Sequence, residues 1–201
     1  NLQQVLDREI KPFNEILEDI IKQYPSFEKE IRMFSEHYSE IVIDEIEGMR
    51  ELLIQLKNDG YKLYGLTNWC SKVYQTLEKF EIFRLLDGYI ISSEEKVIKP
   101  EPEIYQILFN KFNLRPEECI FTDDREDNIL GGRAMGNIHA VFAHQLHLIL
   151  RGPNAVRHDG LHFGINIIID PKQVILVIRI SIERIFRAKE FYKIDFAFAF
   201  R

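Results

Sequence analysis

Hydrophobic residues recur every three or four positions through most of the first 38 residues, and this period predicts amphipathic helices. One expected apolar face is formed by Ile10, Phe13, Ile16, Leu17, Ile20 and Ile21. Tyr24-Pro25-Ser26 interrupts the pattern, and Ser26 is a suitable N-cap for a second helix. Residues 1–38 are therefore predicted to be a helical segment.

From about residue 44 the pattern changes, because short apolar runs alternate with helical segments. The expected strands are 61–66, 89–91, 119–121 and 139–142. The expected helices are one from 49 to a stop at Asp59-Gly60, and 73–80, 103–110 and 127–135. Strands that alternate with helices of about ten residues predict an α/β fold with a doubly wound parallel sheet. Function in such sheets collects at the carboxyl ends of the strands.

The last part of the chain, residues 143–201, has a different character. Two Ile- and Val-rich runs, 165–169 and 174–178, flank a turn-like sequence and predict a β-hairpin, followed by a short helix and a Phe-Ala alternation. Residues 1–142 hold 27 acidic against 17 basic side chains, whereas residues 143–201 hold 5 against 9. This change predicts a boundary near residue 142. The tail is either an appended β module with a pairing surface or aberrant translated sequence, for instance from a shifted reading frame.

Composition narrows the classes of protein. A chain with 46% hydrophobic residues, 29% charged residues and a net charge of −6 is typical of a soluble globular protein. No apolar run is long enough for a membrane span, and no clustered basic face indicates nucleic-acid binding. Cys70 and Cys119 lack the spacing of a disulfide scaffold or a zinc site, so we expect a cytoplasmic protein. The sequence carries no signal for an oligomeric state.

Polar residues follow three of the expected strands. Thr67 and Asn68 come after the first, where they suit a phosphate oxygen or a helix cap. Lys99 follows the second, as a neutralising cation or a solvated surface residue. Asp123 and Asp124 follow the third, and paired carboxylates suit Mg²⁺ or the cap of the next helix. Together these residues predict a pocket for phosphoryl chemistry around Mg²⁺.

Three segments that contain these residues resemble motifs of the haloacid dehalogenase superfamily, most of whose members are Mg²⁺-dependent phosphatases. The segments are Gly65-Leu66-Thr67-Asn68-Trp69, Ile98-Lys99-Pro100-Glu101-Pro102 with Ile104-Tyr105, and Phe121-Thr122-Asp123-Asp124 with Asn128. The resemblance extends to about Phe142 and implies the branch with a helical cap inserted after the first strand. Residues 1–38 would be the cap and residues 39–142 the α/β core.

The resemblance also implies roles for the matching residues. Thr67 and Asn68 would bind the transferring phosphoryl group, and Lys99 would steady the charges on the nucleophile and the phosphate. Asp124 would be the direct Mg²⁺ ligand. Asp123 and Asn128 would support the metal through water or through its other ligands, and Asp127 is an alternative to Asn128.

The implied activity is Mg²⁺-dependent hydrolysis of a small phosphorylated metabolite through an aspartyl-phosphate intermediate. Dehalogenases of this fold work without metal and lack the double acid, so Asp123-Asp124 favours a phosphatase. Phospho-accepting receiver domains carry their acid pair before the Thr and the Lys, and here the pair comes last. The remaining alternative is a non-catalytic interaction protein with the same fold.

One departure from the family pattern is severe. The nucleophile of the family is an Asp at the end of a central first strand that precedes the cap, and this sequence begins at Asn1 without such a strand. Asp7 and Asp19 lie in helical settings and do not qualify. We therefore expect a truncated chain that is inactive as given, with exposed edges on the two inner strands beside the missing one.

Overall fold

The computed structural model describes residues 2–45, 48–136, 139–142, 175–178 and 186–188. Three helices form the N-terminal segment: α1 (Leu2–Arg8), α2 (Phe13–Gln23) and α3 (Glu28–Glu36). The following elements are β1 (Val42–Glu45), α4 (Met49–Asn58), β2 (Lys62–Thr67), α5 (Val73–Lys79), β3 (Gly88–Ile91), α6 (Ser92–Glu95), α7 (Pro102–Phe112), β4 (Cys119–Asp123), α8 (Glu126–Ala134), β5 (His139–Phe142), β6 (Ile175–Ile178) and β7 (Phe186–Ala188). Short 3-10 turns cover Pro25–Phe27, Tyr38–Glu40, Glu81–Leu85 and Pro116–Glu118.

The N-terminal segment is helical, as the period predicts, with two local differences. Ile10 is exposed, because the chain turns at Glu9 (φ 45°) before α2 begins. Ser26 is not an N-cap, because Pro25 starts a 3-10 turn and the second long helix begins only at Glu28. The other five predicted apolar residues of this face are all buried along α2.

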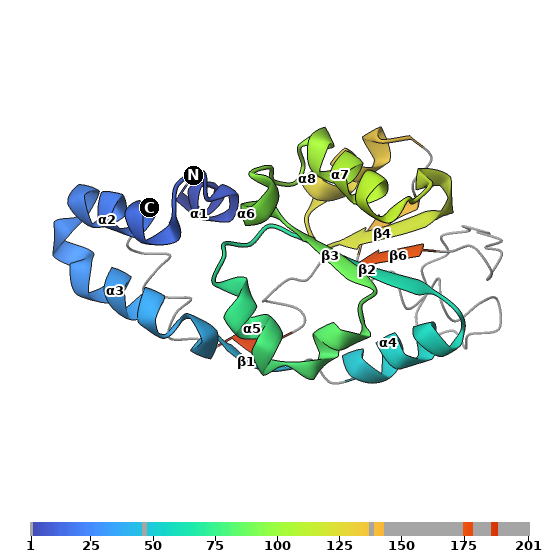
Figure 1. Ribbon diagram of the computed structural model, residues 1–201, viewed down its shortest axis with the longest axis horizontal. Helices are drawn as coiled ribbons and strands as arrows, with labels where there is room; N and C mark the ends of the chain where they lie inside the picture. Colours follow the sequence, from blue (N-terminus) through green and yellow to red (C-terminus); the bar gives the residue numbers. More distant parts are fainter. Residues whose placement is uncertain (1, 46–47, 137–138, 143–174, 179–185, 189–201) are drawn as a thin grey trace, which may run out of the picture.

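The main sheet has five strands in the order β3-β2-β6-β4-β5, and every neighbouring pair is parallel. Helices α7 and α8 lie above one face of the sheet, while α4 and α5 lie below the other (Figure 1). This arrangement confirms the predicted doubly wound α/β fold. The eight strands and helices predicted for the core also match their ranges to within about two residues, whereas β1 and α6 were not predicted.

Strand β6 comes from the tail and lies between the two inner strands. Tyr64 on β2 and Phe121 on β4 both pair with Val177, and each of the two ladders contains four residue pairs. The expectation that the inner edges of β2 and β4 are exposed is therefore wrong. Both edges of β6 are occupied by β2 and β4. The predicted hairpin partner, residues 165–169, lies outside the described residues.

A second small sheet joins another piece of the tail to the segment that follows the N-terminal helices. Strand β7 pairs antiparallel with β1, so residues 186–188 form a strand where a short helix was expected. The predicted Phe-Ala alternation at 195–200 lies outside the described residues. Within its described residues, the tail thus contributes one strand to each sheet.

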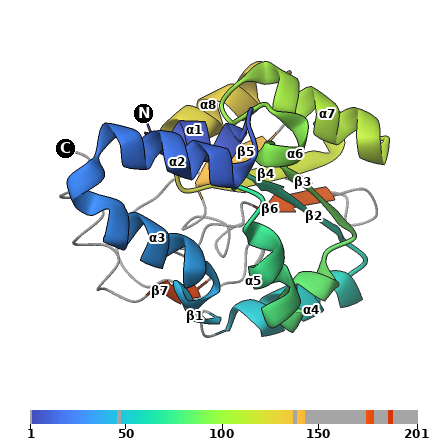
Figure 2. The same cartoon turned by 60° about the vertical axis from the view of Figure 1, so that its left-hand side comes forward.

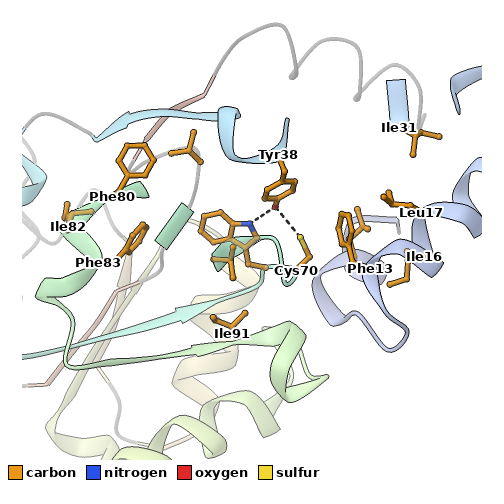
Figure 3. Packing of buried hydrophobic residues seen from close by; sticks show 14 of the residues in the cluster. Phe13, Ile16, Leu17, Ile31, Tyr38, Cys70, Phe80, Ile82, Phe83 and Ile91 are labelled. Atoms are coloured by element: carbon orange, nitrogen blue, oxygen red, sulfur yellow. Dashed lines mark hydrogen bonds between the residues drawn. The ribbon is translucent and has the colours of Figure 1, made fainter. Parts of the chain in front are cut away.

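Two hydrophobic clusters cover the two faces of the main sheet. One contains Ile104, Tyr105 and Phe121 beneath α7 and α8. The other joins the apolar face of α2 to Trp69, Phe80 and Ile91 of the core. Figure 3 shows this second cluster, in which the Cys70 thiol donates a hydrogen bond to the Tyr38 hydroxyl oxygen. The N-terminal helices therefore share a continuous apolar cluster with the α/β core.

No helix in the described part of the chain has the length and apolar character that crossing a membrane requires.

Candidate active site

The carboxyl ends of β2 and β4 are joined by the side chain of Lys99. Its ammonium group donates hydrogen bonds to the backbone carbonyl of Leu66 on β2 and to the Asp123 carboxylate on β4, at 3.0 Å from Oδ2. Parallel strands bring these ends to the same edge of the sheet. Three segments that are distant in sequence therefore meet at one point.

Lys99 and Asp123 form a buried ion pair. The side chains of both residues have 0% exposure. A lysine removed from water keeps its charge only when carboxylates or carbonyls compensate for the lost hydration. The reading of Lys99 as a solvated surface residue is thus wrong, and the chain holds a positive charge inside the protein at the strand ends.

Asp123 accepts several hydrogen bonds in addition to the one from Lys99. Arg125 donates its backbone N–H to Oδ1 at 2.9 Å, and the side-chain amide of Asn128 donates to both carboxylate oxygens at 3.0 and 3.1 Å. Asn128 lies in the first turns of α8, which begins directly after this loop. Nitrogen donors therefore surround Asp123, which makes it an anchor for Lys99 and for the start of α8.

Asn68 braces the loop that carries Lys99. Its side-chain amide donates to the Lys99 carbonyl at 3.0 Å, and its carbonyl oxygen accepts the Lys99 backbone N–H at 2.8 Å. Both polar ends of the Asn68 side chain are thus used on the lysine backbone. Any contact of Asn68 with a phosphoryl group would fall to its own backbone N–H.

Thr67 and Asp124, two further predicted site residues, lie at or directly after the ends of β2 and β4. Thr67 ends β2 and is 2% exposed, while Asp124 is half-buried and follows Asp123 in the turn before α8. Asp127 is exposed and lies 3.4 Å from the guanidinium group of Arg125. This geometry favours Asn128 over Asp127 as the partner of the acid pair.

Several residues that support the site carry no predicted role. The Tyr105 hydroxyl donates to the Asn128 carbonyl at 2.7 Å, and burial together with the nearby Asp123 raises the pKa of Tyr105, so the phenol stays protonated. Gly131 on α8 packs so closely that a Cβ would lie 2.8 Å from the Pro100 carbonyl oxygen. The Arg8 guanidinium binds the Glu101 carboxylate. Tyr105 and Glu101 lie within the quoted motifs, whereas nothing in the sequence pattern singles out Arg8 or Gly131.

The donor set suits Mg²⁺ better than a metal that needs an all-protein cage. In the described part of the chain, no group of three or more His, Cys, Asp or Glu side chains could hold a metal ion. Mg²⁺ is commonly bound by one or two carboxylates, with water and substrate phosphate as the other ligands. Asp124 could supply such a carboxylate, next to an Asp123 that nitrogen donors already surround.

Comparisons with known proteins agree with this fold. A family model described as haloacid dehalogenase-like hydrolase matches residues 3–136. The chain is 32% identical over 94 residues to glyceraldehyde 3-phosphate phosphatase of Pyrococcus furiosus, which covers 46% of this chain and 39% of that protein. It is 29% identical over 124 residues to pyrophosphatase PpaX of Bacillus cereus, which covers 60% of this chain and 53% of that protein. The chain thus spans about half the length of these curated relatives, or less.

Solved structures agree on the fold. A haloacid dehalogenase family enzyme of Bacteroides thetaiotaomicron aligns with a TM-score of 0.61 at 19% identity, over 74% of this chain and 77% of that one. A second structure of that enzyme, in complex with magnesium and inorganic phosphate, aligns with a TM-score of 0.60 at 20% identity, over 71% of this chain and 74% of that one.

Proposed function

The chain belongs to the haloacid dehalogenase-like hydrolase family, and from this premise we propose that it binds phosphoryl groups of small phosphorylated metabolites together with Mg²⁺, as part of a phosphohydrolase site. The observation that carries the proposal is the buried ammonium group of Lys99 between the ends of β2 and β4. A fixed positive charge in a water-poor setting attracts a phosphoryl group far more strongly than a solvated one.

Each residue of the site has a task in this proposal. Lys99 faces the charge of the phosphoryl group, and Asp123 and Asn128 hold Lys99 in place. Thr67 offers its hydroxyl, and Asn68 its backbone N–H, to a phosphoryl oxygen. Asp124 would hold Mg²⁺, which when bound neutralises charge on the phosphoryl oxygens.

Phosphohydrolysis through an aspartyl-phosphate needs a carboxylate that attacks phosphorus. The P–O bond to the alcohol then breaks, the alcohol leaves with a proton, and water later cleaves the acyl phosphate to inorganic phosphate. The Asp123 carboxylate contacts the Lys99 ammonium, and nitrogen donors surround and hold it, so it is not placed to act as the attacking group. We therefore propose that this chain, as given, binds phosphate and Mg²⁺ without turning over a phosphomonoester.

The similar proteins support the reaction class. Two curated relatives are named for phosphatase and pyrophosphatase activity, and one solved structure with the same fold holds magnesium and inorganic phosphate. The acid pair Asp123-Asp124 is consistent with metal-assisted phosphate chemistry. The substrate proposed for this chain is limited to the class of small phosphorylated metabolites.

The test measures Mg²⁺ and inorganic phosphate binding by isothermal titration calorimetry, with phosphate release from p-nitrophenyl phosphate as a second assay. Asp124→Asn should weaken Mg²⁺ binding by about tenfold or more, because it removes a charged ligand. Asp127→Asn is the matched control, since Asp127 is an exposed acid three residues away. Equal Mg²⁺ affinity in both variants would refute the metal assignment. A folded chain that binds neither Mg²⁺ nor phosphate would instead point to the non-catalytic interaction protein.

A further inference from the structure

The C-terminal end of α1 is bound to two of the three loops that form the candidate site, the loops after β2 and after β3. The guanidinium group of Arg8 contacts both oxygens of the Glu101 carboxylate, with Nη1 at 3.0 Å from Oε2, and it also donates to the Lys96 carbonyl at 3.2 Å. Glu9 accepts the Ser71 backbone N–H at 2.6 Å through its carboxylate, and the Lys96 ammonium at 2.5 Å through its backbone carbonyl. Both views show α1 beside α6, the short helix before Lys96 (Figures 1 and 2).

Glu101 in turn closes the turn that contains Lys99. Its backbone N–H donates to the Ile98 carbonyl at 2.9 Å, and its carboxylate accepts the Ile98 N–H at 3.3 Å. Lys99 lies inside this turn, and on its other side Asn68 holds the lysine backbone. The backbone of Lys99 is therefore fixed from two directions, by Asn68 and by Glu101.

Arg8 determines how the Glu101 carboxylate is oriented. A guanidinium group that meets both oxygens of a carboxylate holds it in one plane, which a single point charge does not do. The Arg8 hydrogen bond also lowers the pKa of Glu101, so the carboxylate stays charged near neutral pH. Both side chains are about one-third exposed, and ion pairs with such exposure contribute little to global stability. Orientation of the turn is a task that this pair can perform without contributing much stability.

The main-chain conformation at Glu9 fits the same picture. Its φ of 45° lies in the left-handed region, which costs energy for a residue with a side chain. The contacts from Ser71 and Lys96 hold Glu9 in this conformation at the point where α1 ends. Strain that neighbouring elements maintain marks a position where the direction of the chain is set by tertiary contacts.

We propose that Arg8, acting through Glu101, is a positioning residue for Lys99. Docking of α1 on the loops after β2 and β3 then fixes the lysine charge at the strand ends, and loss of the docking loosens it. The anion that Lys99 receives rests on the proposed function, whereas the order of the Lys99 backbone does not. The N-terminal helix thus becomes part of the anion site without touching the anion.

Four variants separate positioning from a merely structural ion pair. Arg8→Met removes the guanidinium group, and Glu101→Ala removes the acceptor for the Ile98 N–H. Glu101→Gln keeps a carbonyl oxygen as that acceptor. The charge-swapped double variant Arg8→Glu/Glu101→Arg restores an ion pair but leaves the Ile98 N–H without an acceptor. Arg32→Met is the matched control, because Arg32 pairs with Glu18 and Glu28 in the N-terminal segment, on α2 and α3.

The first readout is hydrogen exchange at the Lys99 backbone amide, followed by NMR in the 201-residue chain without ligand. The hydrogen-exchange rate of the Lys99 amide should rise at least about tenfold in Arg8→Met, in Glu101→Ala and in the charge-swapped double variant. It should rise less in Glu101→Gln and not at all in Arg32→Met. The second readout is the affinity for inorganic phosphate with Mg²⁺, which should weaken in the same order by up to about tenfold.

Two results would overturn the proposal. One is a charge-swapped double variant that keeps both the protection of the Lys99 amide and the affinity for phosphate, because the ion pair alone would then be enough to position Lys99. The other is an Arg8→Met variant that moves these readouts no more than Arg32→Met. If the unmodified chain binds no phosphate, the proposed function fails, and the Lys99 amide still decides whether Arg8 positions the loop.

Discussion

The buried ion pair between Lys99 and Asp123 allows a quantitative test of the candidate site. Both side chains have 0% exposure, and the Lys99 ammonium lies 3.0 Å from Oδ2 of the Asp123 carboxylate. Removing one member of a buried pair leaves the other charge without compensation and typically costs about 3–5 kcal/mol. We therefore expect Lys99→Met and Asp123→Asn each to lower the free energy of unfolding by about that amount.

The expected change in melting temperature follows from the size of the chain. For domains of 150–250 residues, 1 kcal/mol corresponds to a shift of about 2–4 °C, so each single variant should melt roughly 6–20 °C lower. The double variant Lys99→Met/Asp123→Asn removes both charges together. Its cost should be smaller than the sum of the two single costs by at least about 2 kcal/mol.

Differential scanning calorimetry and urea unfolding measure these quantities, in EDTA and without phosphate, because bound ligands would add their own stabilisation. The control cycle uses Arg32→Met and Glu18→Gln, an exposed pair whose side chains are 46% and 50% accessible. That cycle should show almost no coupling. Additive costs for Lys99 and Asp123, or a Lys99→Met shift as small as that of Arg32→Met, would refute the buried charge at the strand ends.

Four further predictions test other parts of the molecule. Removal of residues 143–201 should cause aggregation, visible by light scattering, because it uncovers the inner edges of β2 and β4, whereas removal of residues 189–201 alone should not. A monodisperse, folded chain of residues 1–142 would contradict the role of β6. Gly131→Ala should lower the free energy of unfolding by about 1–3 kcal/mol, because its Cβ would meet the Pro100 carbonyl oxygen at 2.8 Å, while Leu130→Ala on the exposed side of α8 should change it little. Burial raises the pKa of Cys70 and of Cys119 to about 12, so neither thiol should react with a disulfide reagent at pH 8 until the chain is unfolded, and rapid labelling of the native chain would show that one of them is accessible. Burial of Asp87 opposes its ionisation, but hydrogen bonds from the Leu63 N–H and from Lys57 outweigh that effect and lower its pKa, so the stability that Asp87 contributes is present above about pH 4 and is lost as the pH falls through the lowered pKa. The difference in unfolding free energy between the unmodified chain and Asp87→Asn should therefore shrink between about pH 5 and pH 2, and a constant difference would refute this linkage.

The hydrophobic pattern of the sequence predicts most of the core elements, because each of these elements is buried along a regular side. Strands buried on both faces need continuous apolar runs, and helices that cover them need one apolar side, so both periods are visible in the sequence. The misses occur where tertiary contacts decide the backbone. Ile10 is exposed because the chain turns at Glu9, where hydrogen bonds from Ser71 and Lys96 fix the backbone. The spacing of apolar residues carries no information about such long-range contacts.

The same limit applies to the candidate site. Thr67, Asn68, Lys99 and the acid pair are recognisable because each follows a strand. The directions of their side chains are not, because Asn68 turns to the Lys99 backbone, 31 residues away, and Arg8 reaches Glu101 across 93 residues. A sequence can place residues at an edge of the sheet, whereas the partner of each hydrogen bond depends on how the elements pack.

In the tail, the number of strands that can pair with β6 decides its position more than nearness in sequence does. Residues 175–178 are apolar and β-branched, so a strand is predicted there, and the nearest apolar run at 165–169 is the natural hairpin partner. A hairpin would satisfy one edge of this strand, whereas the position between β2 and β4 satisfies both edges with four residue pairs on each side. The entropic cost of closing a longer loop rises by only about 0.6 kcal/mol for each doubling of its length, which is small beside the hydrogen bonds of a second ladder. A short apolar strand therefore gains more from the centre of a parallel sheet than from its neighbour in sequence, whatever its place in the chain.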